Sequence, residues 1–361
     1  MKFIHCADLH LDSKMESNLS GEDARLRREE LLDTFSGMVG YASENNITAI
    51  LIAGDLFDKV HIRKHAKQRV WEEINGHPEI DFIYLQGNHD RSDFLDIEGP
   101  YPDNLKLFSG EEWISYSYGD VVITGREITD NNYKTLGANL VLDSTNCNIV
   151  MLHGQESEYE GSDKTYVVNL PEFRDKGIDY LALGHIHSYK LDRLDDRGVY
   201  CYSGALEGRG FDEVGPKGFV VLDVEDKKIS VTFIQFAKRL IHEVVVEVDP
   251  EDDMASILEK IKTYTEMYPE RDLTKVIITG HRSMDLDIDL PRIKRNFENR
   301  FFLFKVCDET RVEINYEQYA NDRSLKGAFV RLMENKDIPD EDRDRIIEIG
   351  MKALMGEEFT D

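Results

Sequence analysis

No apolar run in this 361-residue sequence approaches the roughly 20 residues that a transmembrane helix requires. We therefore expect no membrane span, and because the chain starts without the basic leader and apolar core of a signal peptide, we expect a cytoplasmic protein. Cysteine is scarce as well: Cys6, Cys147, Cys201 and Cys307 are scattered without a CxxC pair. This spacing argues against a disulfide framework, so we expect free thiols without an assigned role.

Positive charge is also in short supply. The chain has 44 Lys and Arg against 71 Asp and Glu, which gives a formal net charge of −27. Residues 1–240 carry 42 acids and 26 bases and residues 241–361 carry 29 and 18, so neither part is a basic arm. Charge alone therefore does not favour strong unassisted binding to DNA. Carboxylates are, however, common ligands of divalent cations, so part of the excess of Asp and Glu is consistent with a metal site.

The length and the hydrophobic pattern predict two or three folded units of an α/β protein. Apolar strand-like runs alternate with helical segments up to about residue 237, with antiparallel strands between Leu105 and Asn148. A small α/β cap follows at 238–318, with strands at 242–248, 275–279 and 301–306 and helices at 253–267 and 291–299. The last unit, 319–361, contains two amphipathic helices at 324–334 and 343–355.

Five apolar runs end in metal-donor side chains, and they organise the first unit. The clearest is Phe82–Leu85, which is followed by Gly87-Asn88-His89-Asp90. A single Gly-Asp or Gly-His pair at a strand end is usually only a turn, but five such ends in one chain indicate a common site at the carboxyl edge of a sheet. The oxygen and nitrogen donors that follow the five runs are Asp8, His10, Asp55, Asn88, His153, His185 and His187. Together they are enough for two metal ions, with Asp55 as the natural bridge.

The most basic stretch of the chain, His61–Arg69, begins shortly after Asp55. Its position places Arg63, Lys64 and Lys67 near the rim of the expected site, where they could contact DNA phosphates. The alternative is that this stretch is only the solvated face of the helix that follows.

The motif series resembles the calcineurin-like metallophosphoesterases. The resemblance rests on Asp8-x-His10, Gly54-Asp55-x-x-Asp58, Gly87-Asn88-His89-Asp90, His153 and Gly184-His185-x-His187, which cover residues 1 to about 190. Within that family the chain most resembles the DNA-repair exonuclease branch that includes SbcD, the nuclease subunit of the SbcCD complex. The resemblance implies an αββα sandwich in which two central sheets are flanked by helices.

The resemblance also implies roles for these residues. Asp8, His10, Asp55 and His187 would hold one metal, and Asp55, Asn88, His153 and His185 the other. Two divalent ions are implied, Mn2+ first and Mg2+, Fe2+ or Zn2+ as alternatives. His89 would contact the scissile phosphate or protonate the leaving oxygen, and Asp90 would orient His89 from behind.

One position departs from the nuclease pattern. Several DNA nucleases of this family have a histidine directly after the Gly-Asp-Leu-Phe segment, whereas this chain has Asp58; His61 or His65 could substitute, or both could be solvated helix residues. The phosphoprotein phosphatases of the family instead have an arginine soon after the aspartate and end the later motif in Glu. Asp58-Lys59 and Asp90 here argue against that branch.

Three functions are compatible with these features. The first is a metal-dependent DNA exonuclease or endonuclease acting in DNA repair, the second a small-molecule phosphodiesterase or nucleotidase, and the third a binding subunit with an inactive site, which the complete donor set argues against. The resemblance implies an SbcC-like coiled-coil ATPase as partner of the nuclease. We expect the C-terminal helices to dock it through Phe329, Leu332 and Met333. Alternatively, these helices pack on the chain's own cap or form a homodimer.

Overall fold

The computed structural model describes residues 1–15, 19, 21–58, 62–90, 93–97, 99–157, 166–314 and 316–355. The chain divides into two compact units, Met1–Leu240 and Ile241–Asp361, each of which is described by itself. In the described parts of the chain no helix has the length and apolar character needed to cross a membrane.

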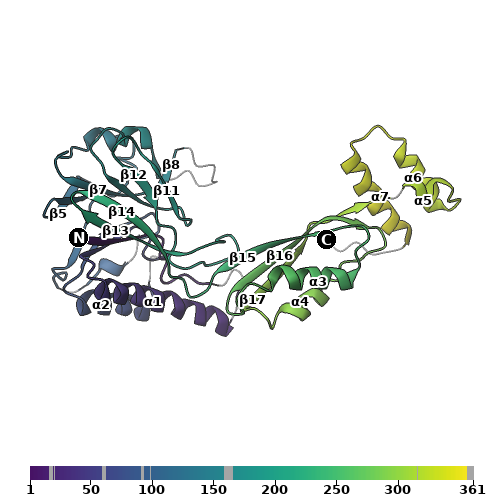
Figure 1. The fold of residues 1–361 in the computed structure, drawn as a ribbon, viewed down its shortest axis with the longest axis horizontal. Helices are drawn as coiled ribbons and strands as arrows, with labels where there is room; N and C mark the ends of the chain where they lie inside the picture. The colour runs from purple at the N-terminus through teal and green to yellow at the C-terminus, as the bar shows by residue number, and fades with distance from the viewer. Residues whose placement is uncertain are drawn as a thin grey trace. The chain divides into compact units, whose positions relative to one another are not determined.

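The first unit contains two six-stranded sheets (Figure 1). The first sheet has, in order, β14 (Lys228–Gln235), β13 (Gly218–Glu225), β1 (Lys2–Cys6), β2 (Ala49–Ala53), β3 (Asp81–Leu85) and β4 (Leu105–Leu107). Strands β1 to β4 run parallel, whereas β13 pairs antiparallel with β1. The carboxyl ends of β1, β2 and β3 therefore lie at one edge of the sheet, which is where their polar continuations gather.

The second sheet repeats this arrangement. Its order is β11 (Lys190–Arg193), β12 (Val199–Tyr202), β10 (Tyr180–Gly184), β7 (Cys147–His153), β6 (Val121–Gly125) and β5 (Ile114–Tyr118). The expected antiparallel hairpin is present as β5 and β6, but β6 then pairs in parallel with β7. Strands β7 and β10 are also parallel, so His153 and Gly184 are register partners. This register brings the two histidine motifs of the second sheet side by side.

The main core lies between the two sheets. Alternate residues of each strand contribute to it, including Leu51 of β2 and Met151 of β7. The intervening residues face outwards: Val150 and Leu152 join a second cluster, formed with Leu170 and Phe173. The two-sheet sandwich that we expected is thus confirmed by the element order and by this alternation.

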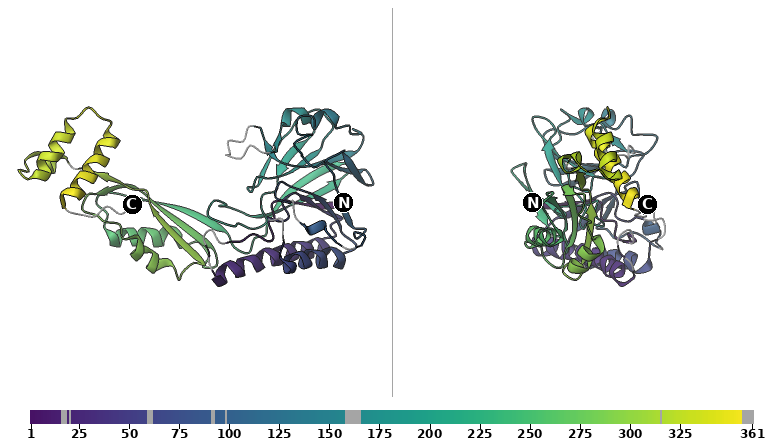
Figure 2. Two further views of the ribbon diagram at one scale, coloured as in Figure 1. Left: turned by 180° about the vertical axis from the view of Figure 1, so that it is seen from behind. Right: turned by 90° about the vertical axis from the view of Figure 1, so that its right-hand side faces the viewer.

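Helices and short turns cover the outer faces of the sandwich. Helices α1 (Gly21–Glu44) and α2 (Lys64–Gly76) lie along the first sheet, with α1 in purple at the lower edge of Figures 1 and 2. The second sheet is covered by loops and by short 3-10 turns, η2 (Gly137–Asn139) and η3 (Leu170–Phe173). The remaining small elements of this unit are η1 (Asp93–Leu95) and the parallel pair β8 (Gln155–Glu156) and β9 (Val167–Val168).

A buried charge network connects α1 to the end of the first unit. Arg27, with an exposed fraction of 1%, donates hydrogen bonds to Glu30 and Glu207 at 2.6 and 3.1 Å. Arg239 donates to the Glu30 carboxylate at 2.8 Å, and the Lys238 N–H donates to Glu207 at 2.6 Å. Because paired carboxylates and guanidinium groups satisfy each other, this buried cluster carries little uncompensated charge.

The second unit has the alternating order that the sequence predicts. Parallel strands β15 (Ile241–Val248), β16 (Leu273–Ser283) and β17 (Leu303–Asp308) form its sheet, with β18 (Arg311–Glu313) added beside the end of β16. Helices α3 (Met254–Thr265) and α4 (Leu290–Phe297) pack on one face through Ile257, Ile261 and Ile293. The start of α3 is set by Asp253, whose carboxylate accepts hydrogen bonds from the N–H groups of Ala255 and Ser256.

The C-terminal helices contact the second unit's own strands. They are α5 (Tyr316–Ala320), which the sequence did not predict, α6 (Leu325–Glu334) and α7 (Asp340–Met355). Met333 lies in a buried cluster with Val312 of β18, and Phe329 packs against that cluster. Met333 is therefore used within the unit and Phe329 is so in part, which favours the alternative that these helices pack on the chain's own cap. Leu332 remains 59% exposed.

Candidate metal centre

Backbone geometry at the strand ends turns the donor side chains towards one another. Asp8, His10, Asp55 and His185 all have positive φ, at 53°, 44°, 53° and 96°. Non-glycine residues rarely adopt this region, and such conformations cluster at functional sites. Gly87 fits the same crowding, since a Cβ there would lie 2.2 Å from Asp55 Oδ1.

The first group of candidate ligands consists of Asp8, His10 and His187, whose donor atoms all lie within 4.8 Å of one another. His10 Nε2 is 3.3 Å from His187 Nε2, and 3.8 Å from Asp55 Oδ2. His187 Nε2 lies 3.9 Å from Asp8 Oδ1. Asp8 and Asp55 each have an exposed fraction of 1%, so these carboxylates converge in a buried position.

The second group is Asp8, Asp55 and His153, with the same limit of 4.8 Å. His153 Nε2 is 3.4 Å from Asp55 Oδ2 and 2.9 Å from Asn88 Oδ1. His185 Nδ1 lies 3.2 Å from the same Asn88 oxygen. The structure thus brings all seven sequence-predicted donors into one place. Asp8 is the residue common to the two groups, and Asp55 Oδ2 lies near His10 of the first group as well as His153 of the second.

The electrostatics of the centre follow from burial and pairing. Burial disfavours the charged form of the Asp55 carboxylate. The positive charge of His153 and its hydrogen bond to Asp55 outweigh this effect, so the pKa of Asp55 is held far below its usual value. Burial likewise opposes the charged form of His153, yet Asp55 raises the pKa of this histidine to about 9. His153 Nδ1 lies 2.9 Å from the carbonyl oxygen of Ala53, which leaves Nε2 to face the centre.

These residues fit a pair of divalent cations. The Nε2 atoms of His10 and His187 face each other at 3.3 Å, an arrangement in which two imidazole nitrogens can share a cation between them. Two buried carboxylates, imidazoles and a carboxamide oxygen form a mixed oxygen and nitrogen set that suits Mn2+, Fe2+ or Zn2+.

His89 and Asp90 differ in their surroundings. The His89 side chain is 48% exposed beside the centre, with its ring 5.5 Å from that of His10. The carboxylate of Asp90 accepts hydrogen bonds from the N–H groups of Leu56, Phe57 and Gly87, at 3.2, 2.9 and 2.9 Å. Burial, reinforced by the charge of Asp55, raises the pKa of Asp90 to about 6.

These hydrogen bonds show that the Asp90 carboxylate holds the backbone on both sides of the site. The expectation that Asp90 orients His89 stays a prediction. The carboxylate beside the His89 ring is that of Asp58, whose Oδ1 lies 3.7 Å from His89 Nδ1 and 3.1 Å from His10 Nδ1.

A loop after β12 contributes residues that the sequence analysis missed. Glu213 Oε1 is 2.7 Å from His187 Nδ1 and accepts hydrogen bonds from Arg209. Lys217, with an exposed fraction of 1%, donates to the His187 carbonyl oxygen at 2.8 Å. Burial opposes the Glu213 carboxylate, but His187 and Arg209 hold its pKa well below the usual range. These residues lie in a loop without periodicity, so no sequence pattern marked them.

The basic stretch after Asp55 is largely paired with acids and carbonyl groups. His61 lies outside the described residues. Arg63 Nη1 is 3.4 Å from Asp12 Oδ1, and Lys67 donates to the Asp93 carbonyl oxygen. His65, considered as a substitute histidine, faces Glu29 at 3.1 Å. Part of the positive charge expected for DNA contact is therefore neutralised within the protein.

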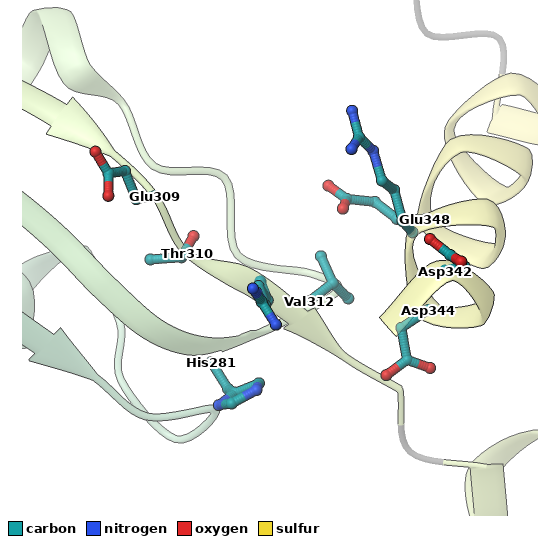
Figure 3. A pocket seen from close by; sticks show the side chains of 9 residues that line it. His281, Glu309, Thr310, Val312, Asp342, Asp344 and Glu348 are labelled. Atoms are coloured by element: carbon teal, nitrogen blue, oxygen red, sulfur yellow. The ribbon is translucent and has the colours of Figure 1, made fainter. Parts of the chain in front are cut away.

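A separate cavity of about 540 Å3 belongs to the second unit (Figure 3). His281, Glu309 and Thr310 lie on one side of it, and Asp344 and Glu348 of α7 on the other. It contains none of the sequence-predicted site residues and carries charges of both signs. We therefore place the chemistry at the strand ends of the first unit.

Comparison with known proteins agrees with this assignment. Residues 1–189 match the family model for calcineurin-like phosphoesterases, and the chain belongs to this family. Its members are dimetal-dependent hydrolases.

Three relatives illustrate where the chain stands. It is 28% identical over 280 residues to the metallophosphoesterase YhaO of Bacillus subtilis, which covers 73% of this chain and 67% of YhaO. It is 25% identical over 288 residues to the DNA double-strand break repair protein Mre11 of Sulfolobus acidocaldarius, covering 73% and 71%. A shorter match, 29% identical over 103 residues, is to a subunit of the nuclease SbcCD of Bacillus subtilis and covers 28% and 25%.

Proposed function

We propose that this protein is a metal-dependent phosphodiester hydrolase that acts on DNA as the nuclease subunit of a repair complex. The observation that carries the proposal is the convergence of two overlapping carboxylate and histidine groups, which share Asp8 and include Asp55, beside the half-exposed His89. The similarity to proteins named as a DNA double-strand break repair protein and a nuclease subunit supports DNA as the substrate class.

In this proposal, one cation is held by Asp8, His10, Asp55 and His187, and the other by Asp55, Asn88, His153 and His185. When bound, the two cations would polarise the phosphate and lower the pKa of an attacking water. The protein's own part is to fix this geometry: Glu213 and Asp58 support the imidazoles of the first group, and the Ala53 carbonyl group supports His153.

His89 is the proposed acid and phosphate contact. Its backbone N–H donates to Asp55 Oδ1 at 3.0 Å, which ties its position to the bridging carboxylate. The side chain itself is half exposed and therefore accessible to a substrate. From there the imidazolium form could donate a hydrogen bond to a phosphate oxygen or a proton to the leaving oxygen.

Two further proposals concern macromolecular contacts. Arg63, Lys64 and Lys67 remain the candidates for DNA phosphates, although Arg63 and Lys67 would have to exchange their present partners for DNA. An SbcC-like ATPase would dock on what the C-terminal helices leave exposed, which includes Leu332 of α6 and Ile346 and Ile349 of α7 at 59%, 42% and 47%. Such a partner would also supply the positive charge that this acidic chain lacks.

An assay of the purified protein with Mn2+ tests the function. Linear duplex DNA, single-stranded DNA, a cyclic nucleotide and a small chromogenic diester are compared, each with and without a chelator. We expect hydrolysis of DNA and of the diester that requires the metal. Hydrolysis of the cyclic nucleotide and the diester with none of DNA, even when the ATPase is added, would favour the alternative of a small-molecule phosphodiesterase or nucleotidase.

A further inference from the structure

Arg209 places a cationic group beside the candidate metal centre. Its Nε and Nη2 atoms donate to Glu213 Oε1 at 3.0 and 2.9 Å, and its backbone N–H donates to Glu213 Oε2 at 2.8 Å. Nη2 is also 3.3 Å from His187 Nδ1. The two guanidinium contacts to Glu213 thus orient the guanidinium group, and the backbone contact holds the same carboxylate in place; the Arg209 side chain is 22% exposed.

The third guanidinium nitrogen faces the reacting side of the site. Nη1 lies 3.6 Å from Asp58 Oδ1, which is longer than the 2.7–2.9 Å typical of a charge-assisted hydrogen bond. The same Asp58 oxygen is 3.1 Å from His10 Nδ1 and 3.7 Å from His89 Nδ1. Nη1 is therefore directed towards the carboxylate shared by a candidate metal ligand and the candidate acid, and it retains N–H capacity for a further acceptor.

The charge of Asp58 bears on how an anionic substrate approaches the site. The Asp58 side chain is 25% exposed, so an anionic substrate that reaches His89 approaches this carboxylate as well. A fixed guanidinium group offsets that repulsion, and its planar fork of donors matches phosphate oxygens. Because Glu213 already orients it, little reorganisation is required when the substrate binds.

We propose that Arg209 is a catalytic residue that contacts a non-bridging oxygen of the substrate phosphate through Nη1. The inference rests on the proposed phosphoesterase function and adds to it a phosphate contact from the protein itself. The competing explanation is that Arg209 only neutralises Asp58 and Glu213 and does not contact the substrate.

The test compares Arg209→Gln, Arg209→Lys and the double variant Arg209→Gln/Asp58→Asn with the wild type. Arg193→Gln is the matched control, because it removes the same charge from a side chain that is 68% exposed and paired with Asp196. Three quantities are measured for each: Mn2+ affinity of the metal-free protein by titration calorimetry, affinity of the metal-loaded protein for inorganic phosphate, and kcat/KM for a small chromogenic diester.

We expect Arg209→Gln to lower phosphate affinity and kcat/KM by roughly 10- to 100-fold, the loss typical of one hydrogen bond to a charged group. Its Mn2+ affinity should stay within about threefold of the wild type. Arg209→Lys should recover part of the loss, because a point charge replaces the oriented fork. Arg193→Gln should behave as the wild type.

The double variant separates the two explanations. If Arg209 contacts phosphate, removing the charge of Asp58 relieves its repulsion of the anion but does not replace the lost contact, so the phosphate affinity of the double variant stays below that of the wild type. Recovery to wild-type affinity would overturn the proposal in favour of charge neutralisation, as would a phosphate affinity unchanged by Arg209→Gln. A loss of Mn2+ affinity in the single variant Arg209→Gln as large as its loss of phosphate affinity would also overturn the proposal, because Arg209 would then act through His187. A wild-type protein that neither binds phosphate nor hydrolyses the diester would instead refute the proposed function itself.

Discussion

The groups that support His187 and His153 differ, and this difference predicts that the two metal positions respond differently to one substitution. His187 is supported by the Glu213 carboxylate at 2.7 Å, whereas His153 is supported by the Ala53 carbonyl group at 2.9 Å. Glu213→Gln keeps the shape of the side chain but removes the negative charge that the imidazole of His187 faces. The position that includes His187 should therefore weaken, and the position that includes His153 should not.

The size of the effect follows from this geometry. Losing a hydrogen-bonded carboxylate behind a ligating histidine lowers metal affinity by about 10- to 100-fold, which corresponds to about 1.4–2.7 kcal/mol. Asp58→Asn should act on the same position through His10, but less strongly, because the Asp58 contact is 3.1 Å.

Titration calorimetry of Mn2+ into the metal-free protein measures the Mn2+ affinity of both positions. In Glu213→Gln we expect one binding step to weaken and the other to keep its affinity, while thermal unfolding in chelator remains cooperative. Equal weakening of both steps would refute the reasoning, because the effect would then pass through the whole site. Unchanged affinity would show that Glu213 does not support the ligand.

Three further predictions test separate features of the protein. Asp55→Ala should abolish activity and lower metal content at both positions by elemental analysis, whereas His89→Ala should retain the metal and lose activity; loss of metal from both would contradict these roles. Burial raises the pKa of Glu127 to about 7 from 4.5, so its contribution to stability is present below pH 4.5 and is lost as pH rises through 7. Glu127→Gln should therefore add about 1–2 kcal/mol to the unfolding free energy at pH 8 and nothing at pH 4.5 in urea titrations, the value being reduced for partial exposure; an equal effect at both pH values would exclude this cause. Leu332→Asp should retain diesterase activity and stability but no longer co-purify with the ATPase, whereas Phe329→Asp should destabilise the C-terminal helices. If the Leu332 variant still co-purified with the ATPase, α6 would not be part of the interface.

The strand ends were predictable because one physical rule governs them. A buried parallel strand is read from a continuous apolar run, and the residue that follows its carboxyl end lies at a shared edge. Asp8, Asp55 and His153 each obey this rule, so their positions along the sequence implied their convergence. The alternation of the second unit was predictable for a similar reason, since Ile257 and Ile261 have helical spacing.

The supporting residues were not predictable in this way. Glu213 and Arg209 reach the centre from an irregular loop, and their partner His187 is more than twenty residues away in the sequence. The hydrogen bonds from the Asp90 carboxylate to backbone N–H groups of Leu56, Phe57 and Gly87 were not predictable either, because they depend on how the turn is folded. Phe329 and Met333 formed a correct helical stripe, but a stripe does not tell which surface covers it.

The position of β1 inside the first sheet has a consequence for how the chain folds during synthesis. β1 pairs with β2 on one side and with β13 on the other, so that Lys2 is the register partner of Asp223. At about 5–20 residues per second, β13 is made roughly 10 to 45 s after β1. Throughout that interval one edge of β1 is open to pairing with another chain. A chain that is truncated before Gly218 would thus keep Asp8 and His10 but leave the adjoining edge of β1 unpaired, so truncation in this region should favour aggregation.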